Sequence, residues 1–404
     1  MTWSHNQIAV TAAAFVGFIG FTLVMPFLPL YIRELGVTDD GDIALWAGLA
    51  TGVTPAVAAL CAPLWGRVAD RFGDKILVQR SLISFVLVMS AMAYATEAWH
   101  LFALRALQGF VGGYGALTIT MAARSAPRER MAQAIGAVQT AQRVGPAIGP
   151  VFGGILAPLV GLRNAFFVSA GVYALAFVLM TVLYKEPSRA SAEPGSSGGR
   201  VAFGNILALE NFLLLMVVIF GFQVVDRLFG PILPLHLDQL GFAPTEVTIL
   251  AGVLFSVLAL AGALGNQVAG RLLARLTPRV IIAGAALVAA VALVGFILSS
   301  SAWLLMLTLG IIGICIGIGS TAAFTAGGSV IPPEVHGSAF GFLTSASLVG
   351  IAVGPVMSGL VGARSIRAMF GVGVGVLVML AIVVRRVMVE RNLPVEPPPA
   401  VEES

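Results

Sequence analysis

Residues 136–154 of this chain read GAVQTAQRVGPAIGPVFGG. This stretch lies in an apolar segment, residues 131–162, that exceeds the roughly 20 residues a membrane-spanning helix needs. The stretch nevertheless carries five glycines, two prolines and one arginine. Small residues four apart let helices approach closely in a membrane, and proline lets a helix bend. The sequence therefore predicts a membrane helix built for close packing.

The same pattern returns later in the chain. At a constant offset, the motif residues recur in matched pairs: Gly136 and Gly341, Gly145 and Gly350, Gly149 and Gly354, Pro150 and Pro355. A second block, MPFLPLYIRELG at 25–36, returns at the same offset as GPILPLHLDQLG at 230–241. A constant offset in two separate segments predicts two homologous halves that run in the same direction.

Composition identifies the solvent of this chain. Hydrophobic residues make up 58% and charged residues only 10%, with a mean hydropathy of +0.97. An ordinary soluble domain has roughly 25% charged residues, so this chain requires lipid around it. The net charge is only +4, and the cations lie between apolar runs, so we expect no nucleic-acid partner. Cys61 and Cys315 lie within apolar runs and predict no disulfide framework.

The apolar runs predict an all-α membrane protein with twelve transmembrane helices in two pseudo-symmetric six-helix halves. The expected spans are 8–31, 43–66, 81–96, 101–123, 131–162, 164–184, 211–235, 247–270, two within 280–333 that turn near 299–301, 335–363 and 368–384. The expected organisation is a first half at 1–184, a cytoplasmic linker rich in Pro, Gly and Ser at 185–205, a second half at 206–390 and a disordered tail at 391–404.

Basic residues predict the orientation. One set of loops collects most of them, in 67–80, 124–130, 185–200, 271–279 and 385–391, whereas the opposite side has Arg33, Arg163, Arg364 and Arg367. By the positive-inside rule, both termini are expected in the cytoplasm of a multi-pass protein of the cell membrane.

The loop GRVADRFGDK, residues 66–75, adds a signature. With the 136–154 stretch, it makes the chain resemble the major facilitator superfamily, and within it the twelve-span drug:proton antiporters of the bacterial multidrug-efflux type. The matching loop residues are Gly66, Asp70, Arg71, Gly73 and Lys75. The resemblance implies that Asp70 faces the start of the eleventh span, at 337–341, as a gating latch. The alternative is a basic loop that serves only as a topology anchor.

Six residues match the antiporter motif of this family: Gly136, Gly145, Gly149, Pro150, Gly153 and Gly154. The resemblance implies that this fifth span packs against the eighth across the interface between halves and favours export. The alternative is that these glycines are ordinary packing devices of a membrane helix.

Charges inside spans are few and costly. Arg105 lies in a segment that resembles the family's fourth-span motif, which is linked to proton movement. Arg143 lies in the fifth span, and Asp226 and Arg227 lie in the seventh. Neighbouring residues on a helix point about 100° apart, so Asp226 need not pair with Arg227. Our hypothesis is that Asp226 exchanges the coupling proton, with Arg105 or Arg143 as its counter-charge. The alternative is a static ion pair.

In the family, spans one, four, seven and ten line a central cavity. The corresponding cavity candidates are Phe18, Thr22, Met25, Gln108, Gln223, Phe229 and Phe324. Such aromatic and Met side chains, with sparse polar groups, suit amphipathic or lipophilic ligands. No metal-ligand set and no hydrolase or nucleotide-binding motif is found in the sequence, so we expect neither an enzyme nor a cofactor.

The sequence therefore predicts a secondary active transporter, monomeric and driven by the proton gradient, that exports lipophilic or cationic small molecules by alternating access. Three alternatives remain: a carrier of the same fold for a sugar or organic acid, a lipid flippase, and a membrane-embedded enzyme or sensor.

Overall fold

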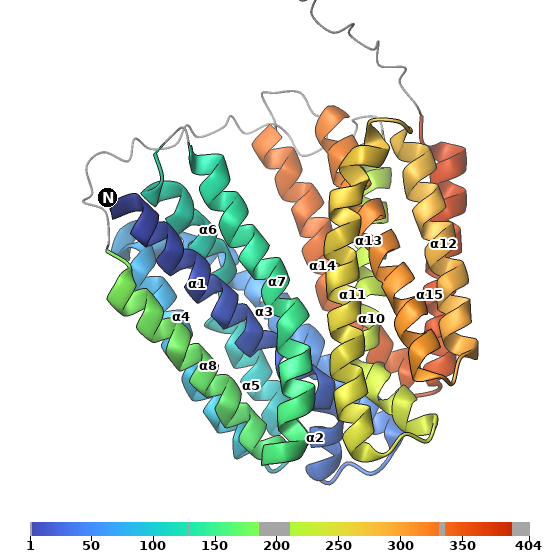
Figure 1. Cartoon of the computed structure of the whole chain (residues 1–404), viewed down its shortest axis with the longest axis horizontal. Coiled ribbons are helices and arrows are strands. Elements are labelled where there is room, and N and C mark those ends of the chain that lie inside the picture. The colour runs from blue at the N-terminus through green and yellow to red at the C-terminus, as the bar shows by residue number, and fades with distance from the viewer. Residues whose placement is uncertain (1, 128–129, 186–210, 331–335, 390–404) are drawn as a thin grey trace, which may run out of the picture.

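The computed structural model describes residues 2–127, 130–185, 211–330 and 336–389. Its regular structure is helical throughout these residues (Figure 1). The elements are α1 (Thr2–Thr22), η1 (Met25–Phe27), α2 (Leu28–Glu34), α3 (Asp40–Phe72), α4 (Asp74–Ala93), α5 (Ala98–Phe110), α6 (Tyr114–Ser125), α7 (Met131–Val160), α8 (Leu162–Leu183), α10 (Phe212–Gln239), α11 (Pro244–Leu273), α12 (Pro278–Leu298), α13 (Ala302–Val330), α14 (His336–Gly362) and α15 (Ile366–Val387). Three predicted segments lie outside the described residues: the linker apart from Lys185, the first residues of the second half at 206–210, and the tail.

The two halves use the same scheme of helix contacts. In the first, α1 packs on α7 and α8, α3 on α5, and α4 on α8. In the second, α10 packs on α14 and α15, α11 on α13, and α12 on α15. Figure 1 shows the two bundles side by side, with the N-terminus and the end of α15 at the same end of the molecule, called here the terminus end. This confirms the predicted pair of pseudo-symmetric six-helix halves.

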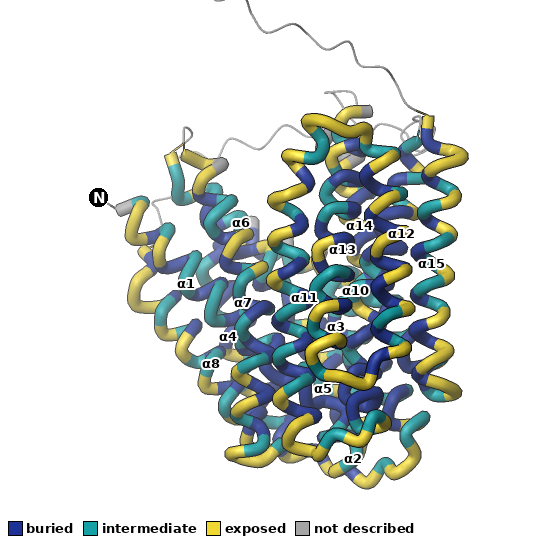
Figure 2. The backbone as a smooth tube through the Cα atoms, turned by 45° about the vertical axis from the view of Figure 1, so that its right-hand side comes forward, coloured by how far each residue is buried: buried dark blue, intermediate teal, exposed yellow. Residues whose placement is uncertain are grey.

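Eleven described helical segments are long and apolar enough to cross a membrane. The predicted fourth span is absent from that count because it is broken into α5 and α6, and with it the predicted total of twelve is reached. Large apolar side chains such as Leu60, Leu159 and Leu298 are exposed on the bundle, whereas buried positions concentrate between the helices (Figure 2). A surface of this kind suits contact with lipid.

The break in the fourth span follows from two glycines and two donors from neighbouring helices. Gly113 adopts a φ of +97°, which a residue with a side chain rarely adopts. Arg80 Nη2 donates to the carbonyl oxygens of Val111 and Gly112 at 2.8 and 3.0 Å. Trp65 Nε1 donates to Phe110 O at 2.6 Å. These bonds satisfy carbonyls that a broken helix would leave unpaired in lipid.

Two pairs of helices, α3 with α14 and α7 with α11, form most of the interface between the halves. Their closest approaches are backbone to backbone. A Cβ added to Gly48 would lie 2.5 Å from Pro355 O, and one added to Gly154 would lie 2.6 Å from Thr248 O. Both contacts lie toward the end of the bundle remote from the termini. The two halves are therefore joined tightly at that remote end.

Candidate functional site: a polar pocket between the halves

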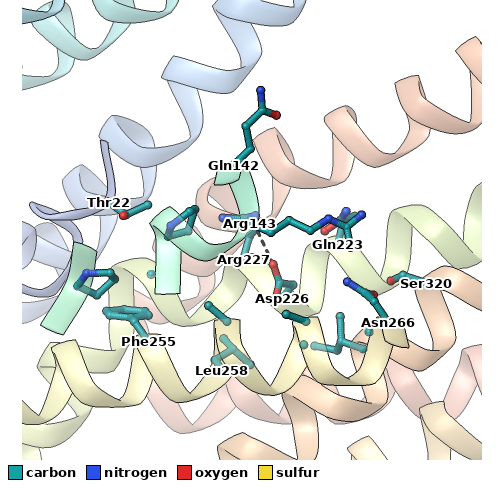
Figure 3. Close-up of a pocket in the computed structure, with 18 of the residues that line it drawn as sticks. Thr22, Gln142, Arg143, Gln223, Asp226, Arg227, Phe255, Leu258, Asn266 and Ser320 are labelled. Carbon is teal, nitrogen blue, oxygen red and sulfur yellow. Dashed lines mark ion pairs between the residues drawn. The ribbon is translucent and has the colours of Figure 1, made fainter. Parts of the chain in front are cut away.

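A pocket of about 380 Å³ lies between the two halves. Residues from α1, α3, α7, α10, α11 and α13 line it, together with Met25 of η1 (Figure 3). Its polar lining consists of Thr22, Thr51, Gln142, Arg143, Gln223, Asp226, Arg227, Asn266, Ser320 and Thr321. Its aromatic and larger apolar lining includes Met25, Phe255, Leu258 and Phe324. The pocket combines apolar surface with a few charges, as small-molecule sites do.

Several residues expected in the cavity line this pocket. They are Thr22, Met25, Gln223 and Phe324, with the charged candidates Arg143 and Asp226. They come from the first, fifth, seventh and tenth spans, so the pocket draws on both halves. Gln223 also donates from Nε2 to Ser347 Oγ of α14 at 2.7 Å, which fixes its position at the wall.

Three expected cavity residues lie elsewhere, inside their own halves. Phe18 packs against the ring of Tyr114, with 6.1 Å between centroids. Gln108 is 1% exposed and accepts a hydrogen bond from Arg105 Nη1 at 3.3 Å. Phe229 is fully buried among other rings of the second half. A helix at the centre of such a bundle has one face toward the pocket and another toward its own half, and these side chains occupy the second face.

Asp226 pairs with its own neighbour on the helix. Arg227 Nε lies 3.1 Å from Asp226 Oδ2, and both side chains line the pocket (Figure 3). The expectation that Arg105 or Arg143 is the counter-charge was therefore wrong for this conformation. Cα–Cβ directions 100° apart do not prevent the pair, because the long Arg227 side chain reaches back to the carboxylate. Arg105 is 2% exposed and lies away from the pocket.

Arg143 instead contacts the other half. The Asn266 amide of α11 lies between Arg143 Nη1 and two groups of α13, Thr321 Oγ1 and Gly317 O. The amide orientation that satisfies all three turns its oxygen toward Arg143 and its nitrogen toward α13, 3.0 Å from each partner. No pattern in the sequence predicts this contact, because it depends on how the two halves face each other. No carboxylate of the described residues pairs with Arg143.

The antiporter-motif glycines divide between two partners. Gly145 and Gly149 pack on α1, where an added Cβ would lie 2.9 Å from Phe15 O and 2.7 Å from Ile19 O. Gly153 is in close contact with Leu23 O, just beyond α1. Gly154 alone faces α11 in the other half. Pro150 lines the pocket, and Gly136 has open space around it. The fifth and eighth spans do pack together, but most of the motif serves contact with the first span.

The signature loop holds the start of α4. Gly73 takes a φ of +95°, which permits the sharp turn between α3 and α4. Lys75 Nζ donates to Tyr184 O at 2.7 Å, and Arg71 lies over the ring of Phe72. Asp74, the next acid after Asp70 in this loop, is 7% exposed and pairs with Arg124 at 2.8 Å. Gly66 lies within α3. The side chains of Asp70 and of residues 337–339 lie outside the described residues, so the latch stays a prediction.

A second set of charges joins the halves at the remote end. Arg33 Nη2 of α2 lies 2.8 Å from Asp238 Oδ2 of α10 and 2.9 Å from Asp40 Oδ1 of α3. The internal repeat could have predicted this pair, because Arg33 and Asp238 occupy equivalent positions in the blocks 25–36 and 230–241.

Comparison with known proteins identifies the family. The sequence profile of the Major Facilitator Superfamily matches residues 10–334 and 212–404. The chain belongs to this superfamily and is a secondary transporter. Among its relatives is the multidrug resistance protein MdtG of Citrobacter koseri, 30% identical over 95% of this chain and 94% of the relative. MdtG of Proteus mirabilis is also 30% identical, over 91% of this chain and 92% of its own length.

Solved structures agree on the fold. A bacterial homologue of the human lysosomal transporter Spinster, in an inward-facing and occupied conformation, aligns with a TM-score of 0.80 at 19% identity. The alignment covers 94% of this chain and 96% of that one. A mutant of the nucleoside transporter NupG aligns with a TM-score of 0.73 at 14% identity, over 94% and 98% of the two chains.

Proposed function

We propose that this chain exports amphipathic small molecules in exchange for protons, as a monomer in the cytoplasmic membrane with both termini in the cytoplasm. The name of its MdtG relatives supports a drug-like cargo. An ion gradient drives the cycle, so no cofactor is needed. The observation that carries the proposal is a pocket between the halves whose described lining includes one carboxylate, that of Asp226, beside two arginines.

Asp226 is suited to carry the coupling proton because of its partners. When ionised, it is held by Arg227. When protonated, it loses that attraction, which frees the Arg227 guanidinium to move or to meet cargo. Proton and cargo thus compete for the same pair of charges, which is the requirement for exchange of one against the other.

The contacts between halves support alternating access. The halves are held together at the remote end by Gly48, Gly154 and the Arg33–Asp238 pair. With the termini in the cytoplasm, this conformation is the one that receives cargo from inside the cell. Export then requires the remote contacts to separate while the terminus ends of the halves approach each other.

The charges of the pocket bear on the cargo. Its described lining carries Arg143 and Arg227 against one acid, Asp226, so a permanent cation meets a net positive wall. We therefore expect neutral or anionic amphiphiles to be exported better than cations of equal size, which narrows the cargo expected from the sequence. The Arg143 guanidinium is the group that would meet an acidic or carbonyl oxygen of the cargo.

Transport in everted membrane vesicles with an imposed pH gradient tests the proposal. The cargoes are a fluorescent lipophilic anion and a lipophilic cation of matched size. The wild type should move the anion only with the gradient, and Asp226→Asn should abolish this dependence. Exchange of labelled for unlabelled cargo without a gradient should persist in Asp226→Asn. The control is Asp42→Asn, which removes an exposed acid outside the pocket.

Full gradient-driven transport by Asp226→Asn would show that the proton site lies elsewhere. Loss of exchange as well would make Asp226 a structural or cargo-binding residue. A wild type that ignores both cargoes but moves a sugar, an organic acid or a labelled lipid would replace the drug-export proposal with one of the other carriers.

A further inference from the structure

A second cavity, of about 500 Å³, lies on the outside of the second half between α12 and α15. Its lining is apolar along most of its length and ends in two arginines. The two arginines are Arg279 and Arg385, and the apolar lining includes Gly284, Leu287 and Ile382. We call it the α12–α15 groove.

Small residues form the floor of this groove. A Cβ added to Gly284 would meet no atom within 4 Å, and Ala283 and Ala381 add only methyl groups beside it. Leu287 and Ile382 form walls and are 52% and 49% exposed. The groove is therefore an apolar furrow open on the side where lipid lies.

The two arginines stand at the terminus end of the groove. Arg279 lies in the first turn of α12 and Arg385 in the last turn of α15. Arg279 Nη2 donates to the backbone oxygen of Arg385, and both residues line the groove. Neither has an ion pair within the described part of the chain. Leu287 lies about 12 Å deeper along α12 at the helical rise per residue, well into one leaflet.

A polar bridge crosses the corresponding space in the first half. Counted from the starts of the paired helices, Gln79 of α4 and Thr181 of α8 correspond to Ala283 of α12 and Arg385 of α15. Gln79 Nε2 donates to Thr181 Oγ1 at 2.8 Å, so a polar bridge crosses the space between α4 and α8. At the same place, the second half has a methyl group and a cation without a carboxylate partner.

We propose that the α12–α15 groove binds one anionic phospholipid of the leaflet at the terminus end, which the positive-inside expectation assigns to the cytoplasm. Its phosphate lies between Arg279 and Arg385, and one acyl chain follows the furrow over Gly284. Basic pockets between transmembrane helices on the cytoplasmic side are suited to anionic headgroups. The site is separate from the central pocket and holds whether or not the proposed export function is correct.

Native mass spectrometry of the full chain, with phosphatidylglycerol and phosphatidylcholine offered together, tests the site. The wild type should retain one phosphatidylglycerol in preference to phosphatidylcholine. Arg279→Gln combined with Arg385→Gln should weaken this retention by about 25-fold, at about fivefold for each arginine near the membrane surface. The matched control is Arg386→Gln, an exposed neighbour that does not line the groove.

Gly284→Leu tests the furrow without removing charge. Because open space surrounds Gly284, the variant should fold normally, as an unchanged melting temperature would show, and still lose the retained lipid. Undiminished retention by Gly284→Leu, or by the double arginine variant, would overturn the proposal. So would an equal loss in Arg386→Gln, because the effect would then reflect general surface charge.

Discussion

The Arg33–Asp238 ion pair offers a direct test of how the two halves are held together. Arg33 Nη2 has two carboxylate partners, Asp238 at 2.8 Å in the other half and Asp40 at 2.9 Å in its own. Asp238→Asn weakens a link between halves, whereas Asp40→Asn removes a bond within one half. The two variants therefore form a matched pair around the same arginine.

The exposure of the side chains bounds the expected effect. Arg33 is 36% exposed and Asp238 is 31% exposed, so water screens part of their attraction. For a partly exposed pair of good geometry, we expect about 1 kcal/mol. The pair exists only while the remote end is closed, so its loss should shift the ratio of open to closed molecules by about fivefold.

Distances between spin labels measure that ratio. Thr96 and Ser300 are exposed, lie in loops at the remote end and belong to different halves. Labels at these positions, in a chain with Cys61→Ala and Cys315→Ala, report the separation of the halves by pulsed electron resonance. Asp238→Asn should increase the long-distance population about fivefold.

Two further variants decide the interpretation. Asp40→Asn should leave the distances of the wild type, because the bond between halves remains. Exchange of the charges, Arg33→Asp with Asp238→Arg, should restore the closed population that Asp238→Asn loses. The reasoning is refuted if Asp238→Asn leaves the distances unchanged, or if Asp40→Asn opens the remote end equally.

Two predictions concern the stability of the fold, one through packing and one through hydrogen bonds. Gly154→Leu should lower the melting temperature in detergent, because its Cβ would lie 2.6 Å from Thr248 O and overpacking of this kind costs about 1–3 kcal/mol. The control is Gly136→Leu, since Gly136 has open space around it. Equal stability of the two variants would contradict the close contact between α7 and α11. Arg80→Leu should cost about 2 kcal/mol, because it leaves carbonyls between α5 and α6 without their charged donor. Thermal unfolding measures this loss, and a wild-type melting temperature would show that the break in the fourth span does not need Arg80.

The sequence was sufficient for the fold because lipid permits few solutions. A chain in hydrocarbon must satisfy its backbone within each segment, so long apolar runs become helices and their count gives the architecture. The exception is the fourth span, which the sequence predicts as a single span at 101–123 and the structure divides into α5 and α6. Its break depends on Arg80 and Trp65, which come from other helices and supply donors to the freed carbonyls. The sequence of that span alone does not contain these donors, so it does not predict the break.

The site was only partly predictable for a related reason. Polar residues in apolar spans, such as Gln223 and Asp226, predicted the pocket correctly, because such groups are costly in a membrane and mark functional sites. Phe229, one turn away on the same helix, packs into its own half instead. An aromatic side chain can pack toward the pocket or toward its own half, so the residue type does not predict which way it points. Asn266 was missed because its contact with Arg143 requires both halves in place.

The internal repeat also explains where the halves must differ. Residues that pack inside each half can repeat, as Pro29 and Pro234 do. Positions near the axis that relates the halves meet their own equivalents, and two identical charges there would repel each other. Arg33 and Asp238 are such a pair, and opposite charges turn a repulsion into a link. By the same register, the equivalent of Asp226 is Phe21. The carboxylate proposed to carry the proton therefore occurs at this repeat position in one half only. A strictly symmetric chain would carry a second carboxylate in the first span, and wherever two carboxylates lie close together each opposes ionisation of the other.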